Sequence, residues 1–169
     1  MSIRKNFRNA VVALLAVFAA GLAQAQPPTG PMSFFIASTG SGNGANLGGL
    51  AGADAICQAR AEAAGAGNRT WRAYLSTQGP NAVNARDRIG SGPWFGAGGN
   101  RIAMNVDDLH SMGHRISLLT ALDQNGNIIP GSGYSPNRHD ILTGSQPDGT
   151  AYPAGEDMTC NNWTSNSDT

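Results

Sequence analysis

The chain has 169 residues, of which 40% are hydrophobic and 13% are charged, and its eleven basic and eleven acidic residues give a formal net charge of zero. This length suits one domain and hardly two. The single lysine is Lys5, and beyond residue 25 there is no lysine and no cluster of basic residues, which argues against nucleic acid or an anionic lipid surface as the main partner.

Residues 1–25 have the layout of a secretory signal, with a basic start over 4–8, an apolar run over 10–20 and small residues up to Ala25. We expect cleavage after Ala25 and a secreted or periplasmic protein. The apolar run is shorter than the ~20 residues that span a bilayer, so a membrane anchor is disfavoured. After cleavage eight basic and eleven acidic residues remain, a net charge of −3, and no segment is apolar enough to span a membrane.

The next residues, 26–31, contain proline and glycine and predict a flexible leader ahead of one domain over 32–169. The run 32–37 is apolar, with aromatic and β-branched members, and predicts a strand. Residues 38–49 are rich in glycine, serine and asparagine and predict a loop.

Helical spacing begins at Leu50 and continues to Ala64. Cys57 falls on the apolar face of this helix, so we expect it to point inward. Asp54 suits the first turn, and Gly65 can end the helix. The following residues, 71–76, alternate between apolar and polar side chains, which predicts a half-buried strand.

The middle of the chain is less regular. We expect a helical turn over 85–89, a brief strand over 102–104, and loops over 105–113 and 124–133. The second of these loops contains the pair Asn125-Gly126, which favours a turn.

Large aromatic residues lie beside turn residues in the segment Ser91-Gly-Pro-Trp94-Phe95. Such residues usually fill a core from a loop, and less often they form a stacking platform for a sugar ring. Both interpretations of Trp94 stay open at this point.

Two blocks resemble the endostatin-like members of the C-type lectin-like fold. The first runs from Gly52 through Cys57 to Ser76, and the second runs from Ile141 through the Pro147-Asp148-Gly149 turn to Cys160 and Trp163. They are similar also to bacterial secreted proteins described as lectin-like. The resemblance implies an α+β domain with short helices, short antiparallel strands and long loops.

The resemblance also implies a pairing for each cysteine. In the family, the helix cysteine bonds to one on the last strand, and the cysteine before the tryptophan bonds to another shortly ahead of that strand. Carried over, Cys57 and Cys160 would have partners beyond Thr169, and the domain would lack its last strands. The alternative is a Cys57–Cys160 bond, which would close a long loop and stabilise the fold by several kcal/mol on chain-entropy grounds.

Calcium is possible, but no motif indicates it, and we expect no cofactor. Calcium needs six to eight converging oxygens, and the acidic candidates lack the spacing of a calcium-binding loop. They are Asp107, Asp108, Asp140, Asp148, Glu156 and Asp157. Asp148 is expected to hold its Pro-Asp-Gly turn, and the pair 156–157 a solvated loop.

Histidines offer two weaker candidates. His110 and His114 have the spacing of a zinc pair on a helix, but the glutamate of the metalloprotease motif is absent. His139 precedes Asp140, which suggests acid–base chemistry, although neighbouring residues rarely face each other. No serine or cysteine lies in a nucleophile motif.

The sequence therefore predicts an exported binding module without catalytic activity, directed at a glycan or an extracellular protein. The candidate ligand-binding residues are Trp94, Asn137, Arg138, Asp140 and Asp148. The alternative is an exported hydrolase that uses His139 with a nearby carboxylate.

Overall fold

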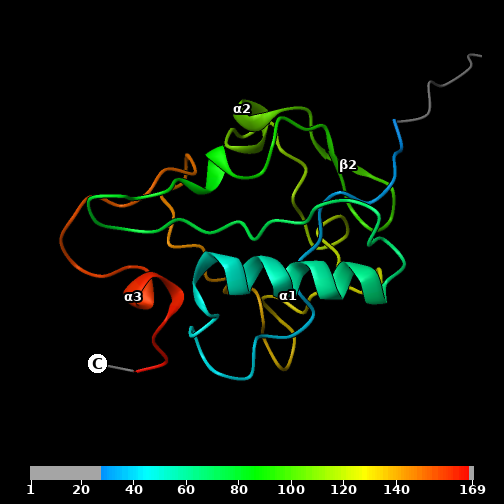
Figure 1. The fold of residues 1–169 in the computed structure, drawn as a ribbon. Helices are drawn as coiled ribbons and strands as arrows, with labels where there is room; N and C mark the ends of the chain where they lie inside the picture. The colour runs from blue at the N-terminus through cyan, green and yellow to red at the C-terminus, as the bar shows by residue number, and fades with distance from the viewer. Residues whose placement is uncertain (1–27, 168–169) are drawn as a thin grey trace, which may run out of the picture.

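In the computed structural model, which describes residues 28–167, the chain forms a small mixed α+β domain. The expected signal over 1–25 lies outside the described residues. The long helix α1 (Gly49–Ala63) runs across the front of the molecule in Figure 1. None of the helices in the described part of the chain is long and apolar enough to cross a membrane.

The other elements are short. They are the 3-10 turn η1 (Ala85–Asp87), strands β1 (Trp94–Phe95) and β2 (Arg101–Ala103), and the helical turns α2 (Val106–Leu109) and α3 (Cys160–Trp163). β1 and β2 pair antiparallel, with Trp94 opposite Ala103. Figure 1 shows α2 and the sheet on one side of α1, and α3 beside its first turn.

The helix prediction is confirmed within one residue at each end. α1 ends in a Schellman motif, because the N–H of Gly65 donates to the carbonyl of Glu62 and that of Ala66 donates to Ala61. Gly65 has a φ of 75°, which glycine adopts without strain. The η1 and β2 predictions are confirmed also, with shifts of one or two residues.

Asp54 does not lie in the first turn of α1, contrary to prediction. Its carboxylate leaves the helix and accepts from both Arg72 and Arg88, and also from the backbone N–H of Ala73 at 2.8 Å. The side chains of Asp54 and Arg88 are only 13% and 10% exposed. A carboxylate that was expected in the first turn of the helix instead joins the helix to the next segment.

The segment 71–76 has the predicted alternation of burial as far as Leu75, but the polar Ser76 is fully buried. The segment forms no strand, so that prediction is wrong. The backbone N–H groups of this segment donate to side chains and to a loop carbonyl rather than to a neighbouring strand. The N–H of Trp71 donates to the Gln58 side chain, that of Ala73 to Asp54, and that of Ser76 to the carbonyl of Thr143.

Residues 29–37, ahead of α1, and the segment 105–113 also differ from prediction. Residues 32–37 form no strand: Ile36 makes an isolated bridge with Asp123, and the N–H groups of Ser33 and Phe34 donate to the carbonyl of Phe95. The leader was expected to be free, but Thr29 pairs with Asn100 and the N–H of Gly30 donates to Gly99, so residues 29–30 belong to the fold. Within the predicted loop 105–113, α2 forms because the Asn105 side chain accepts from the N–H of Asp108.

Two clusters make up the core. One joins α1 to α3 through Ala53, Ala73, Leu75 and Trp163, and Cys57 packs against it half-buried, as predicted. The other surrounds the sheet with Trp94, Ile102, Ala103 and Leu109. Both lie on the α1 and sheet side of the molecule, away from residues 131–142, which are almost all exposed.

Candidate functional site

Trp94 belongs to the core, which corrects its place among the candidate ligand-binding residues. Its side chain packs with Ile102 and Leu109, and the residue is 7% exposed. Strand pairing with Ala103 holds it there. A buried ring has no face on which a sugar can stack, so of the two interpretations the core one is correct.

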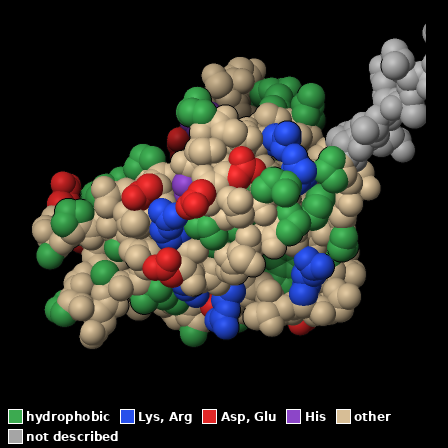
Figure 2. Space-filling model, turned by 90° about the horizontal axis from the view of Figure 1, so that it is seen from above, with side chains coloured by type: hydrophobic (Ala, Val, Ile, Leu, Met, Phe, Trp, Pro, Cys, Tyr) green, Lys and Arg blue, Asp and Glu red, His purple; other side chains and the backbone are tan. Residues whose placement is uncertain are grey.

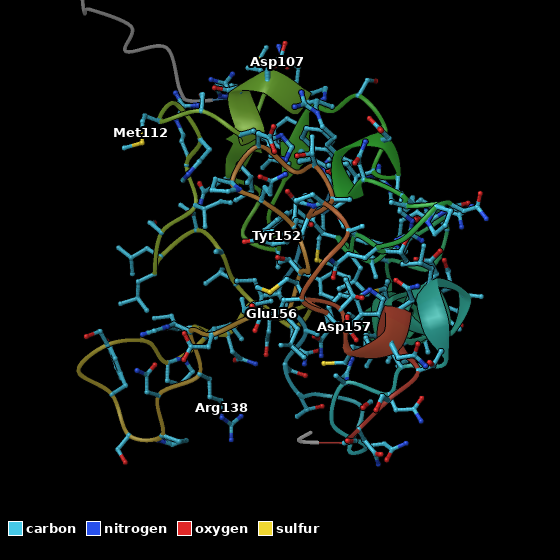
Figure 3. All side chains as sticks on the ribbon, turned by 90° about the vertical axis from the view of Figure 1, so that its left-hand side faces the viewer. Asp107, Met112, Arg138, Tyr152, Glu156 and Asp157 are labelled. Carbon is cyan, nitrogen blue, oxygen red and sulfur yellow. The ribbon has the colours of Figure 1, made fainter. Side chains whose placement is uncertain are left out.

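Three of the remaining candidates, Asn137, Arg138 and Asp140, lie together on one exposed loop over residues 131–142. The loop is held by its backbone: the N–H of Tyr134 donates to Gly131 and that of Arg138 donates to Pro130 at 2.7 Å. Figure 3 shows Arg138 on the outer side of the molecule, well apart from Glu156 and Asp157.

The polar side chains of this 131–142 loop have unused hydrogen-bonding capacity. Within residues 28–166, the Asn137 side chain accepts from the N–H of His139 and donates to nothing, and the side chains of Tyr134 and Arg138 make no hydrogen bond or ion pair. Tyr134 is half exposed and was not among the predicted residues. Its place in the run Gly-Ser-Gly-Tyr-Ser-Pro, an aromatic between turn residues, is a signal that could have identified it.

His139 and Asp140 do face each other, although neighbouring residues rarely do. The His139 Nδ1 and Asp140 Oδ1 atoms lie 3.0 Å apart, with side chains 51% and 96% exposed. Such an exposed pair contributes little energy, because water screens it. No serine, threonine or cysteine side chain within residues 28–166 hydrogen-bonds the His139 ring.

Asp148 lies elsewhere and has a different role. It holds the Pro147-Asp148-Gly149 turn, as predicted, by accepting from the hydroxyl of Thr150 at 2.6 Å and from its N–H. Those hydrogen bonds, led by the hydroxyl, lower the pKa of Asp148 below its ordinary value. The Asp148 backbone accepts from Arg86, which also pairs with Asp107.

Next to this turn lies an arrangement that the sequence did not indicate. The Nδ1 atom of His110 lies 2.6 Å from the carbonyl of Val106, so Nδ1 carries the proton and Nε2 accepts from the Tyr74 hydroxyl at 2.7 Å. Burial raises the pKa of Tyr74. Gly149 packs against His110 so closely that a Cβ at 149 would clash with the ring. His110 is thus a structural residue.

His114 takes no part in that arrangement, since its Nδ1 accepts from the N–H of Ile116. Within the described residues, no group of three or more His, Cys, Asp or Glu side chains could hold a metal ion. The zinc and calcium candidates therefore do not converge in this part of the chain.

The turn α3 is left-handed, with φ between 50° and 68° from Cys160 to Trp163. Non-glycine residues adopt this conformation at a cost of roughly 1–2 kcal/mol each. Asp157 helps to hold it by accepting from the N–H groups of Thr159 and Asn161, and those hydrogen bonds, led by that of Asn161, lower its pKa. The pair 156–157 is exposed, as predicted, but Asp157 has a structural role as well.

A small pocket of about 280 Å³ opens between α3 and Gln78. The Gln78 side chain is fully used: it donates to the carbonyls of Pro153 and Glu156 and accepts from the N–H of Met158. Asn162 exchanges hydrogen bonds with the Gln78 backbone. These side chains hold the loop, and little polar capacity is left for a ligand.

Both cysteines are free thiols in the structure. Burial raises the pKa of the Cys57 thiol, and the nearby charge of Asp54 raises it further. The partners implied beyond Thr169 for Cys57 and Cys160 stay a prediction, and the structure shows no bond between the two.

Charges of both signs share the surface. Figure 2 shows arginines beside acidic side chains on the face seen from above, consistent with the Arg86–Asp107 pair. Exposed apolar side chains are common along 111–142: Met112, Ile116, Leu118, Leu119, Ile128, Tyr134, Ile141 and Leu142.

Comparison of the chain with protein-family models, with curated proteins and with solved structures found no match. The similarity to endostatin and the C-type lectin-like fold therefore gains no support from these comparisons and stays a prediction. The arguments that follow rest on the geometry of this chain alone.

Proposed function

We propose that the protein is an exported, non-catalytic carbohydrate-binding module of the C-type lectin-like class, and that the 131–142 loop carries its ligand contacts. The observation that supports this best is the unused hydrogen-bonding capacity of the exposed side chains of Tyr134, Asn137 and Arg138. A folded chain usually spends such groups internally or on water, and a loop that presents several of them together suits recognition.

The chemistry of these groups matches a sugar. Sugar recognition needs planar polar groups for the hydroxyls and an apolar face for the ring carbons. Asn137 and Arg138 supply an amide and a guanidinium, Asp140 supplies a carboxylate, and Tyr134 supplies an aromatic ring. Asp148 is left out of this set because it lies with Arg86 and Thr150, in another part of the fold.

A glycan array probed with the exported protein tests the proposal, with calcium and with a chelator. We expect binding that drops at least fivefold in Arg138→Ala and in Asn137→Ala. Arg69→Ala is the matched control, because Arg69 is also exposed and its side chain has no partner in residues 28–166. A blank array under both conditions, or equal losses in Arg138→Ala and Arg69→Ala, would contradict the proposal.

The second candidate is a hydrolase, favoured by the 3.0 Å contact between His139 and Asp140. Chromogenic esters and glycosides incubated with the protein distinguish the two functions. The binding proposal predicts no turnover and a His139→Ala variant that still binds glycans. Turnover that disappears in His139→Ala would favour the hydrolase instead.

A further inference from the structure

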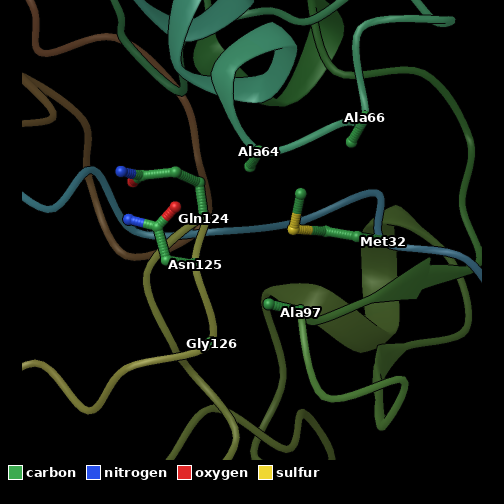
Figure 4. A pocket seen from close by; sticks show the side chains of 7 residues that line it. All are labelled: Met32, Ala64, Ala66, Ala97, Gln124, Asn125 and Gly126. Carbon is green, nitrogen blue, oxygen red and sulfur yellow. The ribbon is translucent and has the colours of Figure 1, made fainter.

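A second cavity lies apart from the 131–142 loop, where the end of α1 meets the N-terminal segment and two turns. Its volume is about 370 Å³, at the lower end of the ~300–1,000 Å³ usual for small-molecule pockets. Figure 4 shows its walls. They include Met32, Ala64, Ala66, Ala97, Gln124 and Asn125.

One side of this pocket is apolar and the other is polar. In Figure 4 the Met32 side chain reaches toward Ala64 and Ala66 with Ala97 below, and Gln124 and Asn125 lie on the other side with their amides at the pocket edge, directed away from Met32. None of the lining residues is charged. An ion in this pocket would give up water without gaining a counter-charge, so the pocket favours a neutral ligand.

The Gln124 side chain and the Asn125 backbone are fixed before any ligand arrives. Gln124 is clamped to Ser38 in both directions: its Oε1 accepts from the Ser38 N–H at 3.2 Å, and its Nε2 donates to the hydroxyl at 2.8 Å. Asn125 is positioned by the carboxylate of Asp123, which accepts from its N–H at 2.8 Å. A fixed site loses less entropy when it binds.

The Asn125 carboxamide has no hydrogen-bond partner within residues 28–166, and this exposed side chain at the edge of the pocket keeps its donors and its acceptor for a ligand. The C-terminal end of α1 borders the same space through Ala64 and Ala66. That end of a helix carries partial negative charge and prefers hydrogen-bond donors. Hydroxyl groups satisfy both conditions, because they donate and accept without net charge.

We propose that this pocket is a subsite for one monosaccharide unit, a neutral ring with several hydroxyls. The less polar face of the ring lies against Met32 and the three alanines, and its hydroxyls bond to Asn125 and to the remaining capacity of Gln124. The inference rests on the proposed carbohydrate binding and adds a place for a single sugar residue, separate from the 131–142 loop.

The test is a titration of the ¹⁵N-labelled full chain with glucose, galactose, mannose and N-acetylglucosamine, each added alone. At least one sugar should shift the amide signals of Ala64, Ala66, Asn125 and Gly126. Asn125→Ala should weaken that sugar at least fivefold, and Ala97→Phe, which fills the cavity, should abolish its binding. Asn68→Ala, an exposed asparagine without a side-chain partner in residues 28–166, should bind as the wild type does.

Two results overturn the inference: no shift at the pocket with any of the four sugars, or equal affinity in Asn125→Ala and the wild type. The loop and the pocket can fail separately. If glycans bind on the array and their affinity drops in Arg138→Ala but not in Asn125→Ala, the pocket proposal is contradicted and the loop proposal is supported. If the amide signals at the pocket shift while no glycan binds on the array, the loop proposal is contradicted and the pocket proposal is supported.

Discussion

Polar side chains on α1 and the segments packed against it hydrogen-bond to other parts of the chain, whereas many of those along residues 111–142 face solvent. Asp54 alone receives hydrogen bonds from Arg72, Arg88 and the Ala73 backbone. Arg138, in the other region, bonds through its backbone only. The difference suggests a division in which the α1 region supplies stability and the 131–142 loop stays available for a ligand.

Of the changes that test this division, Trp163→Ala should cause the largest loss of stability. Trp163 is 1% exposed, and its indole N–H donates to the carbonyl of Ser76 at 2.7 Å. Removal of this side chain should lower the free energy of unfolding by about 3–5 kcal/mol. The matched change in the other region is Leu119→Ala, which should cost less than about 0.5 kcal/mol because that side chain is mostly exposed. Urea denaturation followed by fluorescence measures both.

Trp163→Ala is so large a change that the variant could fail to fold, and Trp163→Phe then gives the answer. It keeps an aromatic ring but leaves the buried Ser76 carbonyl without its donor, at a cost of about 1–3 kcal/mol. If Trp163→Phe and Leu119→Ala cost the same, the two regions do not differ as described.

Asp54→Asn should come next, with a loss of about 2 kcal/mol. The change keeps the shape of the side chain but removes the charge that Arg88 faces in a largely buried position. Asp87→Asn is the control, since Asp87 is exposed and accepts only from the Asn84 side chain. Equal losses of stability in the two variants would show that the hydrogen bonds to Asp54 stabilise the fold no more than an exposed carboxylate does.

The same carboxylate predicts a pH dependence. Burial alone would raise the pKa of Asp54, but hydrogen bonds from Arg72, Ala73 and Arg88 outweigh it, so the net pKa is lowered. Its stabilisation is therefore present above the unfolded value of about 3.9 and is lost as pH falls through the lower folded value. The gap in stability between the wild type and Asp54→Asn should shrink below about pH 4. A gap that stays constant from pH 7 to pH 3 would contradict this.

Gly149→Ala sharpens the comparison through backbone conformation. Gly149 has a φ of 81°, and a Cβ there would meet the His110 ring and come within 2.9 Å of Arg86 Cβ. Gly126→Ala is the matched control, because its φ is 84° and nothing lies within 4 Å of its Cβ position. Both variants suffer the left-handed strain of about 1–2 kcal/mol, and Gly149→Ala should lose clearly more. Thermal denaturation measures both losses of stability, and equal losses in Gly149→Ala and Gly126→Ala would contradict this prediction.

The smallest expected effect on stability is that of Arg138→Ala, within about 0.5 kcal/mol. Trypsin should nonetheless cut the folded wild-type chain at Arg138 well before Arg88, because exposed loops are cleaved first. Peptide mass analysis at short digestion times identifies the order, and early cleavage at Arg88 would argue against an anchored α1 region.

Local patterns predicted the elements that depend on neighbouring residues. Helical spacing and Gly65 defined α1 because its hydrogen bonds are internal, and the Asn125-Gly126 turn formed because its partners lie within five residues. The alternation from Trp71 to Leu75 predicted which side chains are buried, although Ser76 is buried against the pattern. It could not show that a helix side chain, Asp54, would replace a neighbouring strand as hydrogen-bond acceptor.

The candidate site was predicted only in part, for the same reason. Asn137, Arg138 and Asp140 are neighbours in sequence and remain together on one loop. Trp94 was placed among the candidate ligand-binding residues, although packing in the sheet cluster, with distant Phe34 and Tyr74 among the neighbours, buries it. Asp148 holds the turn that its Pro-Asp-Gly pattern predicted. The Asn125 pocket depends on contacts between distant segments, which no local pattern reveals.

Hydrogen exchange of the intact chain tests the division of the molecule most directly. The amides of Ala73 and Trp163, which donate to Asp54 and Thr159, should exchange only through unfolding of the whole domain. Those over 132–142 that lack a partner should exchange at nearly the rate of a free peptide. Equal protection of the two sets would contradict the account, because the loop would then be as firmly held as the core.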